Sequence, residues 1–172
     1  RFKCDWSSDV CSSDLEFSAA ALSGRTPEVV SRTTDLGDAV MTAIVVAPFL
    51  DRAVRFVGLE RLRVQECDRV AALYEGLTAC GGRVELIGDD LLVHPSTLHG
   101  GEIETYDDHR VAMCFALLGL FVPGIVIREP SCVSKTFPDF FRKLAEPMPE
   151  GLGAGLRDAS DGRALSGADL LP

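Results

Sequence analysis

Positively charged side chains recur beside expected helix starts, where they could bind a small anion. Three short polar segments interrupt the apolar part of the chain: RLRVQECDR (61–69), TYDDHR (105–110) and SKTF (134–137). Arg69 and Arg110 fall in the first turn of their expected helices, and Lys135 just precedes a third. The helix dipole disfavours a cation there unless an anion binds, and a guanidinium can hold a carboxylate or phosphate through two hydrogen bonds. Together the three cations predict a site for a small polyanion, although each alone fits a solvated or ion-paired surface residue.

Three further side chains near these cations could move protons. Asp38 and Glu66 carry carboxylates, and the imidazole of His109 titrates near neutral pH. Simpler interpretations stay open: Asp38 could cap the helix that follows it, and Glu66 could pair with Arg69 or Arg63. The residue types therefore allow acid–base chemistry without requiring it.

The elements that must position these residues alternate between apolar helices and apolar strands, which predicts an α/β fold. We expect, in chain order, a helix over 39–50, a strand over 53–59, a helix over 68–80, a hairpin over 83–95, a helix over 110–121, a strand over 124–129 and a helix over 138–145. Asp38 is expected to cap the first helix, and Pro138 to lie near the first position of the last one.

The order of these elements repeats along the chain. At an offset of 71 residues Val40 falls on Val111 and Asp68 on Asp139, so helix, strand, polar loop and helix recur without a gap. We interpret this as two copies, the second incomplete, of one unit of roughly 70 residues. Chance agreement between two α/β segments is the alternative.

Both ends of the chain differ in composition from the middle. Residues 1–15 (RFKCDWSSDVCSSDL) lack any helical or strand periodicity, and from residue 4 they match the peptide that a common sequencing adapter encodes in one frame. We interpret them as an adapter-derived artefact rather than an ordinary polar tail. Residues 146–172 are rich in Gly, Ala and Asp and lack aromatics, which predicts a flexible tail. Residues 16–145 are left as the partial domain that must carry any chemistry.

Composition excludes several classes of function. The net charge is -9 and no run of five basic residues occurs, which argues against nucleic-acid binding. The sequence contains neither an apolar stretch of the roughly 18 residues that a membrane span needs nor a secretory signal, so we expect a cytoplasmic protein without membrane contact. The cysteines beyond the first fifteen residues lack metal-site spacing, and we expect them to be reduced. They are Cys67, Cys80, Cys114 and Cys132.

Three motifs in register resemble the C-terminal part of the EPSP synthase family. They are QECDR before an amphipathic helix that ends in Gly-Gly, then TYDDHRVAM, then SKTFPDFF. The resemblance implies an enolpyruvyl transferase fold of repeated βαβαββ units, of which about two of six would be present here. It also implies transfer of the enolpyruvyl group of phosphoenolpyruvate to the 5-hydroxyl of shikimate 3-phosphate, with release of phosphate, in the shikimate pathway of aromatic amino-acid biosynthesis. No metal or organic cofactor is implied, and the full-length enzyme is expected to be a monomer.

The resemblance assigns a role to each candidate residue. The cations that would hold phosphoenolpyruvate are Arg69, Arg110 and Lys135. Asp38 would bind the shikimate hydroxyls and act as the base, and Glu66 would donate or shuttle a proton, with His109 assisting beside it. Asp68 and Asp108 would be structural, one as a helix cap and the other by orienting Arg or His.

Two positions depart from the family pattern. Gln65 stands where the family motif Lys-Glu-Thr-Asp-Arg has a Lys that contacts the shikimate moiety, and Arg61 stands where the family has an Asn. Gln65 remains the expected ligand of shikimate 3-phosphate, but it provides a neutral hydrogen bond, which is about half as strong as a charge-assisted one.

Two other functions remain as alternatives. The sister enzyme that acts on UDP-N-acetylglucosamine shares the fold, although DDHR together with KTFPDFF favours the shikimate enzyme. The departure at Gln65 also fits a non-catalytic, degenerate fragment. The family domain that grips the shikimate phosphate has no counterpart in this chain, so we expect the chain alone to be inactive.

Overall fold

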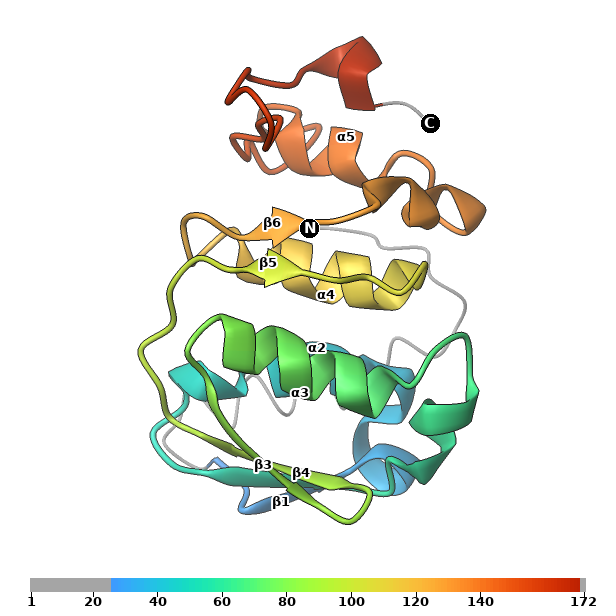
Figure 1. Cartoon of the computed structure of the whole chain (residues 1–172), viewed down its shortest axis with the longest axis vertical. Coiled ribbons are helices and arrows are strands. Elements are labelled where there is room, and N and C mark those ends of the chain that lie inside the picture. The colour runs from blue at the N-terminus through green and yellow to red at the C-terminus, as the bar shows by residue number, and fades with distance from the viewer. Residues whose placement is uncertain (1–25, 171–172) are drawn as a thin grey trace.

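A computed structural model describes residues 26–170 (Figure 1). The adapter-like residues 1–15 and the first part of the expected 16–145 domain lie outside the described residues. The first half of the described chain follows the order β-α-β-α-β-β that the family resemblance implies. Its elements are β1 (Val29–Ser31), α2 (Val40–Val46), β2 (Val54–Val57), α3 (Arg69–Ala79), β3 (Arg83–Ile87) and β4 (Asp90–His94).

These strands form one four-stranded sheet in the order β1-β2-β4-β3. β1 and β2 are parallel, with Val30 opposite Phe56, because α2 carries the chain back to the starting edge between them. β3 and β4 form the hairpin expected around Gly88 and Asp89. Helices α2 and α3 cover one face of this sheet (Figure 1).

A second, shorter unit follows and confirms the repeat. It comprises β5 (Glu102–Ile103), α4 (His109–Leu118), β6 (Val126–Ile127), a 3-10 turn (Pro130–Lys135) and α5 (Phe140–Ala145). Arg55 and Val126, which are 71 residues apart, occupy matching places: each pairs with a parallel strand on its own sheet, opposite Val29 and Glu102 respectively. Within residues 26–170 the second sheet has two strands and lacks a counterpart of the hairpin, as expected for an incomplete copy.

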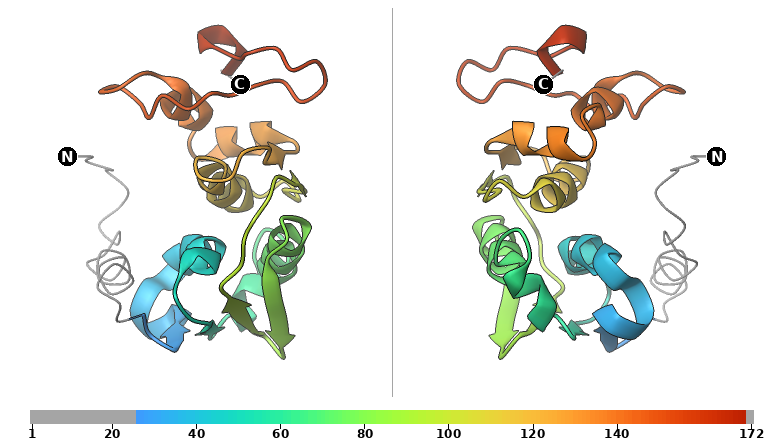
Figure 2. Two further views of the ribbon diagram at one scale, coloured as in Figure 1. Left: turned by 90° about the vertical axis from the view of Figure 1, so that its left-hand side faces the viewer. Right: turned by 90° about the vertical axis from the view of Figure 1, so that its right-hand side faces the viewer.

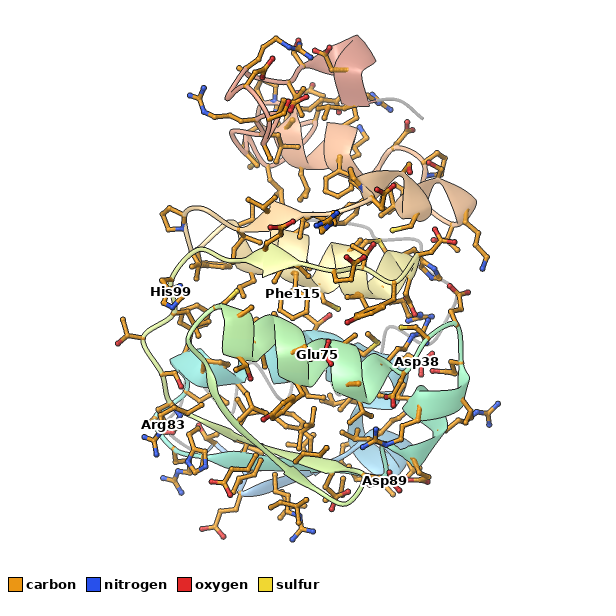
Figure 3. All side chains as sticks on the ribbon, viewed as in Figure 1. Asp38, Glu75, Arg83, Asp89, His99 and Phe115 are labelled. Atoms are coloured by element: carbon orange, nitrogen blue, oxygen red, sulfur yellow. The ribbon has the colours of Figure 1, made fainter. Side chains whose placement is uncertain are left out.

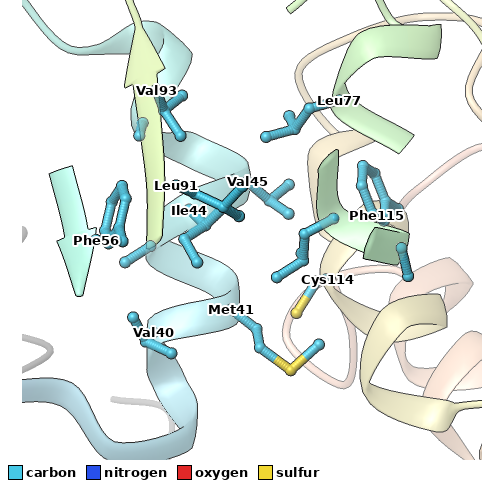
Figure 4. Close-up of a cluster of buried hydrophobic side chains, with 14 of the residues drawn as sticks. Val40, Met41, Ile44, Val45, Phe56, Leu77, Leu91, Val93, Cys114 and Phe115 are labelled. Carbon is cyan, nitrogen blue, oxygen red and sulfur yellow. The ribbon is translucent and has the colours of Figure 1, made fainter. Parts of the chain in front are cut away.

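The hydrophobic core joins the two units through three helices. Side chains of α2, α3 and α4 meet those of β2 and β4 in one buried cluster (Figure 4). Phe115 of α4 is fully buried, and its ring lies against Gly76 of α3, where a larger residue would collide with it. The three helices therefore pack side by side and are seen nearly end-on in Figure 2.

Several expected boundaries were wrong. The first helix ends at Val46 and continues as a 3-10 turn over Ala47–Phe49, because Pro48 has no N–H with which to extend the α-helix. Asp38 does not cap α2, since its carboxylate binds an arginine instead. The last helix begins at Phe140, two residues later than expected, so Pro138 lies just before the N-cap Asp139. The strands expected over 53–59 and 124–129 are observed as β2 and β6, and each is shorter at both ends than expected.

Residues 146–170 pack on α5, and the helical structure within them is one 3-10 turn over Gly167–Leu170. The amide of Ala154 donates to the carbonyl of Leu144 at 2.8 Å, and Arg157 and Ala164 form an isolated antiparallel bridge. The flexibility expected for 146–172 stays a prediction. Within the described part of the chain, the helices are too short or too polar to cross a membrane.

Candidate active site

A pocket with a volume of about 380 Å³ opens where α2, α3 and α4 begin. Figure 3 labels Asp38 at this end of the three helices. Six of the seven site residues expected from the sequence line the pocket: Asp38, Gln65, Glu66, Arg69, His109 and Arg110. The seventh, Lys135, reaches it through Glu66, since its Nζ lies 2.9 Å from Oε1 of that carboxylate. Motifs far apart in the sequence therefore converge on one cavity.

Arg69, which lines the pocket, forms a buried ion pair with Asp108 behind it. Nε of Arg69 donates to Oδ2 of Asp108 at 2.7 Å, and the two side chains are 3% and 0% exposed. The other carboxylate oxygen of Asp108 accepts the backbone N–H of Arg110 at 2.8 Å and so caps α4. Burial acts to raise the pKa of Asp108, but the hydrogen bond and charge of Arg69 outweigh it and lower that pKa. The structural role expected for Asp108 is confirmed, as is the cap that Asp68 forms on α3.

Gln65 holds the other side of the same guanidinium. Nη1 of Arg69 donates to Oε1 of Gln65 at 2.6 Å. A Lys in this place would supply a cation where Arg69 needs an acceptor. The departure from the family motif at Gln65 therefore fits a local hydrogen bond with Arg69.

Glu66 joins the third motif to the first two. Its Oε1 accepts from Lys135, and its Oε2 lies 3.1 Å from Nδ1 of His109. The expectation that Glu66 could pair with Arg69 or Arg63 was wrong, because Asp108 and Gln65 occupy Arg69 while Asp68 and Asp89 occupy Arg63. The hydrogen bond from Lys135 lowers the pKa of Glu66, against the effect of burial, and the charge of His109 adds to this lowering. Glu66 is therefore an ionised carboxylate at neutral pH in this structure.

Asp38 lies between two arginines. Nη2 of Arg32 donates to its Oδ1 at 2.7 Å, and Nη2 of Arg110 lies 3.5 Å from its Oδ2. Burial acts to raise the pKa of Asp38, but the hydrogen bond from Arg32 and the charges of Arg110, Arg32 and Arg69 outweigh it and lower that pKa. Asp38 is thus ionised and turned toward the pocket.

The three expected anion-binding cations differ in how accessible they are. Arg69 is 3% exposed and already bonded on two sides, whereas Arg110 is 35% exposed and Lys135 is 65% exposed. An incoming anion can approach Arg110 and Lys135 directly. Among residues 26–170 it competes with one carboxylate at each, Asp38 at Arg110 and Glu66 at Lys135. Arg69 lines the pocket and contributes the charge of a guanidinium that Asp108 and Gln65 hold in place.

The same end of the helices contains a group of possible metal ligands. Glu66, Asp108 and His109 place ligand atoms within 4.8 Å of one another. Arg69 neutralises Asp108 and Lys135 neutralises Glu66, so a divalent cation would have to displace both. The arrangement of charges therefore favours an anion over a metal ion.

Sequence reasoning missed Arg32. It lies six residues before Asp38, at the start of a single π-helical turn (Arg32–Leu36), and no α-helix or strand periodicity in the sequence places the two together. The only signal available was its short separation from a candidate base. Arg61, by contrast, is exposed and does not line the pocket.

Comparisons with known proteins find relatives over most of this chain. The family described as EPSP synthase (3-phosphoshikimate 1-carboxyvinyltransferase) matches residues 17–144. A 3-phosphoshikimate 1-carboxyvinyltransferase from Pseudomonas syringae pv. tomato is 47% identical over 118 residues, covering 65% of this chain and 28% of the relative. One from Rhizobium etli is 48% identical over 132 residues, covering 73% of this chain and 30% of the relative.

A solved structure gives the same result. The EPSP synthase of Acinetobacter baumannii superposes with a TM-score of 0.60 at 28% identity, covering 70% of this chain and 28% of that one. This likeness confirms the enolpyruvyl transferase fold, and the chain spans less than a third of the length of the relatives it matches. With its three motifs gathered at one pocket, its paired β-α units and these relatives, the chain belongs to the EPSP synthase family.

Proposed function

We propose that the full-length protein containing this chain transfers the enolpyruvyl group of phosphoenolpyruvate to the 5-hydroxyl of shikimate 3-phosphate and releases phosphate. The observation that carries the proposal is the convergence of three separate motifs on one pocket that combines cations with ionised carboxylates. Phosphoenolpyruvate is a small molecule with a phosphate and a carboxylate, and it suits a site with several positive groups. Both substrates are small molecules, and we place the enzyme in the cytoplasm as a monomer without nucleic-acid partners.

The three cations differ in exposure, which supports different roles for them in binding the substrates. Arg110 and Lys135, as the accessible pair, would bind the acidic groups of phosphoenolpyruvate, while Arg69 would contribute from the buried side. Gln65 would donate its amide N–H to shikimate 3-phosphate, because its oxygen already accepts from Arg69. Fixed charges of this kind stabilise the charge that develops on a departing phosphate.

The carboxylates would exchange protons with the substrates. When Lys135 turns to the bound anion, Glu66 loses the hydrogen bond that lowers its pKa, and it can then bind a proton and deliver it to C3 of phosphoenolpyruvate. Asp38 would take the proton of the 5-hydroxyl as that oxygen bonds to C2. Glu66, left ionised by the first step, would then take back a C3 proton as the C2–O bond to phosphate breaks, which restores the double bond and releases phosphate. Asp38 would pass its proton to solvent or to the departing phosphate. His109 touches Glu66 and would assist its proton exchange.

A chimera tests this function. Residues 17–144 of this chain would replace the corresponding segment of the Pseudomonas syringae relative, and phosphate release from phosphoenolpyruvate would be measured with shikimate 3-phosphate as acceptor. We expect release that depends on the acceptor. We expect none from the 172-residue chain alone, because it spans only 28% of that relative.

The same assay separates the alternatives. Release with UDP-N-acetylglucosamine instead of shikimate 3-phosphate would assign the chain to the sister reaction. A folded chimera that is inactive with both acceptors would support the degenerate-fragment alternative. Activity that appears only after Gln65→Lys would overturn the proposal for this sequence and would identify Gln65 as the cause.

A further inference from the structure

We propose that Arg32 is a positioning residue for Asp38, fixing one carboxylate oxygen so that the other faces the pocket. Neither the family motifs nor the lining of the pocket includes Arg32. Arg32 would set the orientation and charge of Asp38, and the effect of this on catalysis rests on the base role proposed above for Asp38.

The contact between the two side chains is close and sheltered. Nη2 of Arg32 lies 2.7 Å from Oδ1 of Asp38, and the arginine side chain is only 14% exposed. Its Nε is buried and has no hydrogen-bond partner in the part of the chain that the structure describes. A charged group removed from water in this way needs a counter-charge, and Asp38 supplies it.

The segment before Asp38 is shaped to make this contact. Oγ of Ser31 accepts from the N–H groups of Thr33 and Thr34, and the Asp35 carboxylate accepts from the N–H of Ser31. The N–H of Gly37 then donates to the carbonyl of Arg32, at a positive φ of 54° that favours glycine. This closed turn places the sixth residue after Arg32 against its guanidinium.

Two cations contact different oxygens of the Asp38 carboxylate. Arg32 binds Oδ1 from outside the pocket, whereas Arg110 approaches Oδ2 from the pocket lining. The third charged group that acts on Asp38 is Arg69. An anion that recruits Arg110 would leave Oδ2 free, and Arg32 would still hold the carboxylate ionised and oriented. Asp38 could then accept a proton through Oδ2.

Carboxyl-carbon NMR on the 172-residue chain tests this directly without requiring turnover. The Asp38 carboxyl resonance would be followed against pH in the unmodified chain and in Arg32→Met, Arg32→Gln and Arg32→Lys. The matched control is Arg55→Met, which removes the same charge from the exposed pair with Asp90. We expect Asp38 to titrate at higher pH in the Met and Gln variants than in the control, and Arg32→Lys to restore part of the difference.

Thermal melts followed by circular dichroism would show that each variant is folded. If Arg32→Met does not fold, the comparison between Arg32→Gln and Arg32→Lys decides, because it changes the charge while keeping a polar side chain. The same Asp38 midpoint in the folded Arg32 variants and in Arg55→Met would overturn the proposal. This result is independent of the assay of the chimera, so failure of the positioning role and failure of the proposed function are distinguishable.

Discussion

Asp108→Ala is expected to lower the free energy of unfolding of the chain by about 3–5 kcal/mol. The substitution leaves the guanidinium of Arg69 buried without its counter-charge. It also removes the cap of α4, because the N–H groups of Arg110 and Val111 lose their acceptor. Urea unfolding followed by circular dichroism would measure the loss.

Two comparisons separate the buried pair from ordinary effects of charge. Asp90→Ala breaks the more exposed pair with Arg55 and should cost at most about 1 kcal/mol. The double variant Arg69→Met/Asp108→Leu removes both charges, and it should be less destabilised than Asp108→Ala because no lone charge stays buried. If Asp90→Ala and Asp108→Ala lowered the free energy of unfolding equally, the buried pair would not stabilise the chain more than an exposed pair does.

The same pair predicts the direction of a pH effect. The folded-state pKa of Asp108 is lowered, so its contribution to stability is fully present above the unfolded-state pKa of about 3.9. That contribution is lost as the pH falls through the lower, folded-state pKa. Asp108→Asn should therefore lose less stability on acidification than the unmodified chain does.

Glu66→Gln in the chimera is expected to reduce kcat by about 10²–10⁴-fold, the usual contribution of a group that transfers a proton. Gln keeps the shape of the side chain and can still accept from Lys135, but it cannot deliver a proton to carbon. Because Glu66 is partly exposed and its ion pair with Lys135 is accessible to water, stability should change by less than about 1 kcal/mol. Steady-state phosphate release and thermal melts would measure the two effects.

The control for Glu66→Gln is Glu85→Gln on β3. Glu85 contacts His94 on the exposed side of the hairpin and is not part of the pocket, so its substitution should leave kcat unchanged. If Glu66→Gln kept the kcat of the unmodified chimera, Glu66 would not be the proton donor. The anion-binding cations would then have to act with a different acid.

Much of the scaffold could be predicted from the sequence because it depends on local signals. Asp68 and Asp108 precede apolar helices, and both cap them as expected. The repeat could be found because apolar residues are buried near the start of a helix in each unit, as Val40 and Val111 are. Hydrophobic periodicity and capping chemistry are sufficient for such predictions.

The pairings inside the site could not be predicted, because they depend on tertiary distances. The sequence offered Arg63 and Arg69 as partners of Glu66, but the fold brings Lys135 to it from 69 residues away. The sequence suggested a cap for Asp38, but the turn closed at Gly37 brings Arg32 to its carboxylate instead. In both cases pairing with an opposite charge, once across the fold and once across a short turn, outweighs the simpler alternative that the sequence offered.

An NMR titration of the 172-residue chain with phosphoenolpyruvate would show whether the three motifs form one anion site. Amide shifts would be followed up to about 10 mM ligand, a range that detects even millimolar affinity. We expect changes that cluster at Glu66, Arg69, Arg110 and Lys135. They should disappear in Arg110→Met and persist in the control Arg128→Met, which alters an exposed pair with Glu102. Changes that are absent from these residues, or that are unaffected by Arg110→Met, would contradict a single anion site.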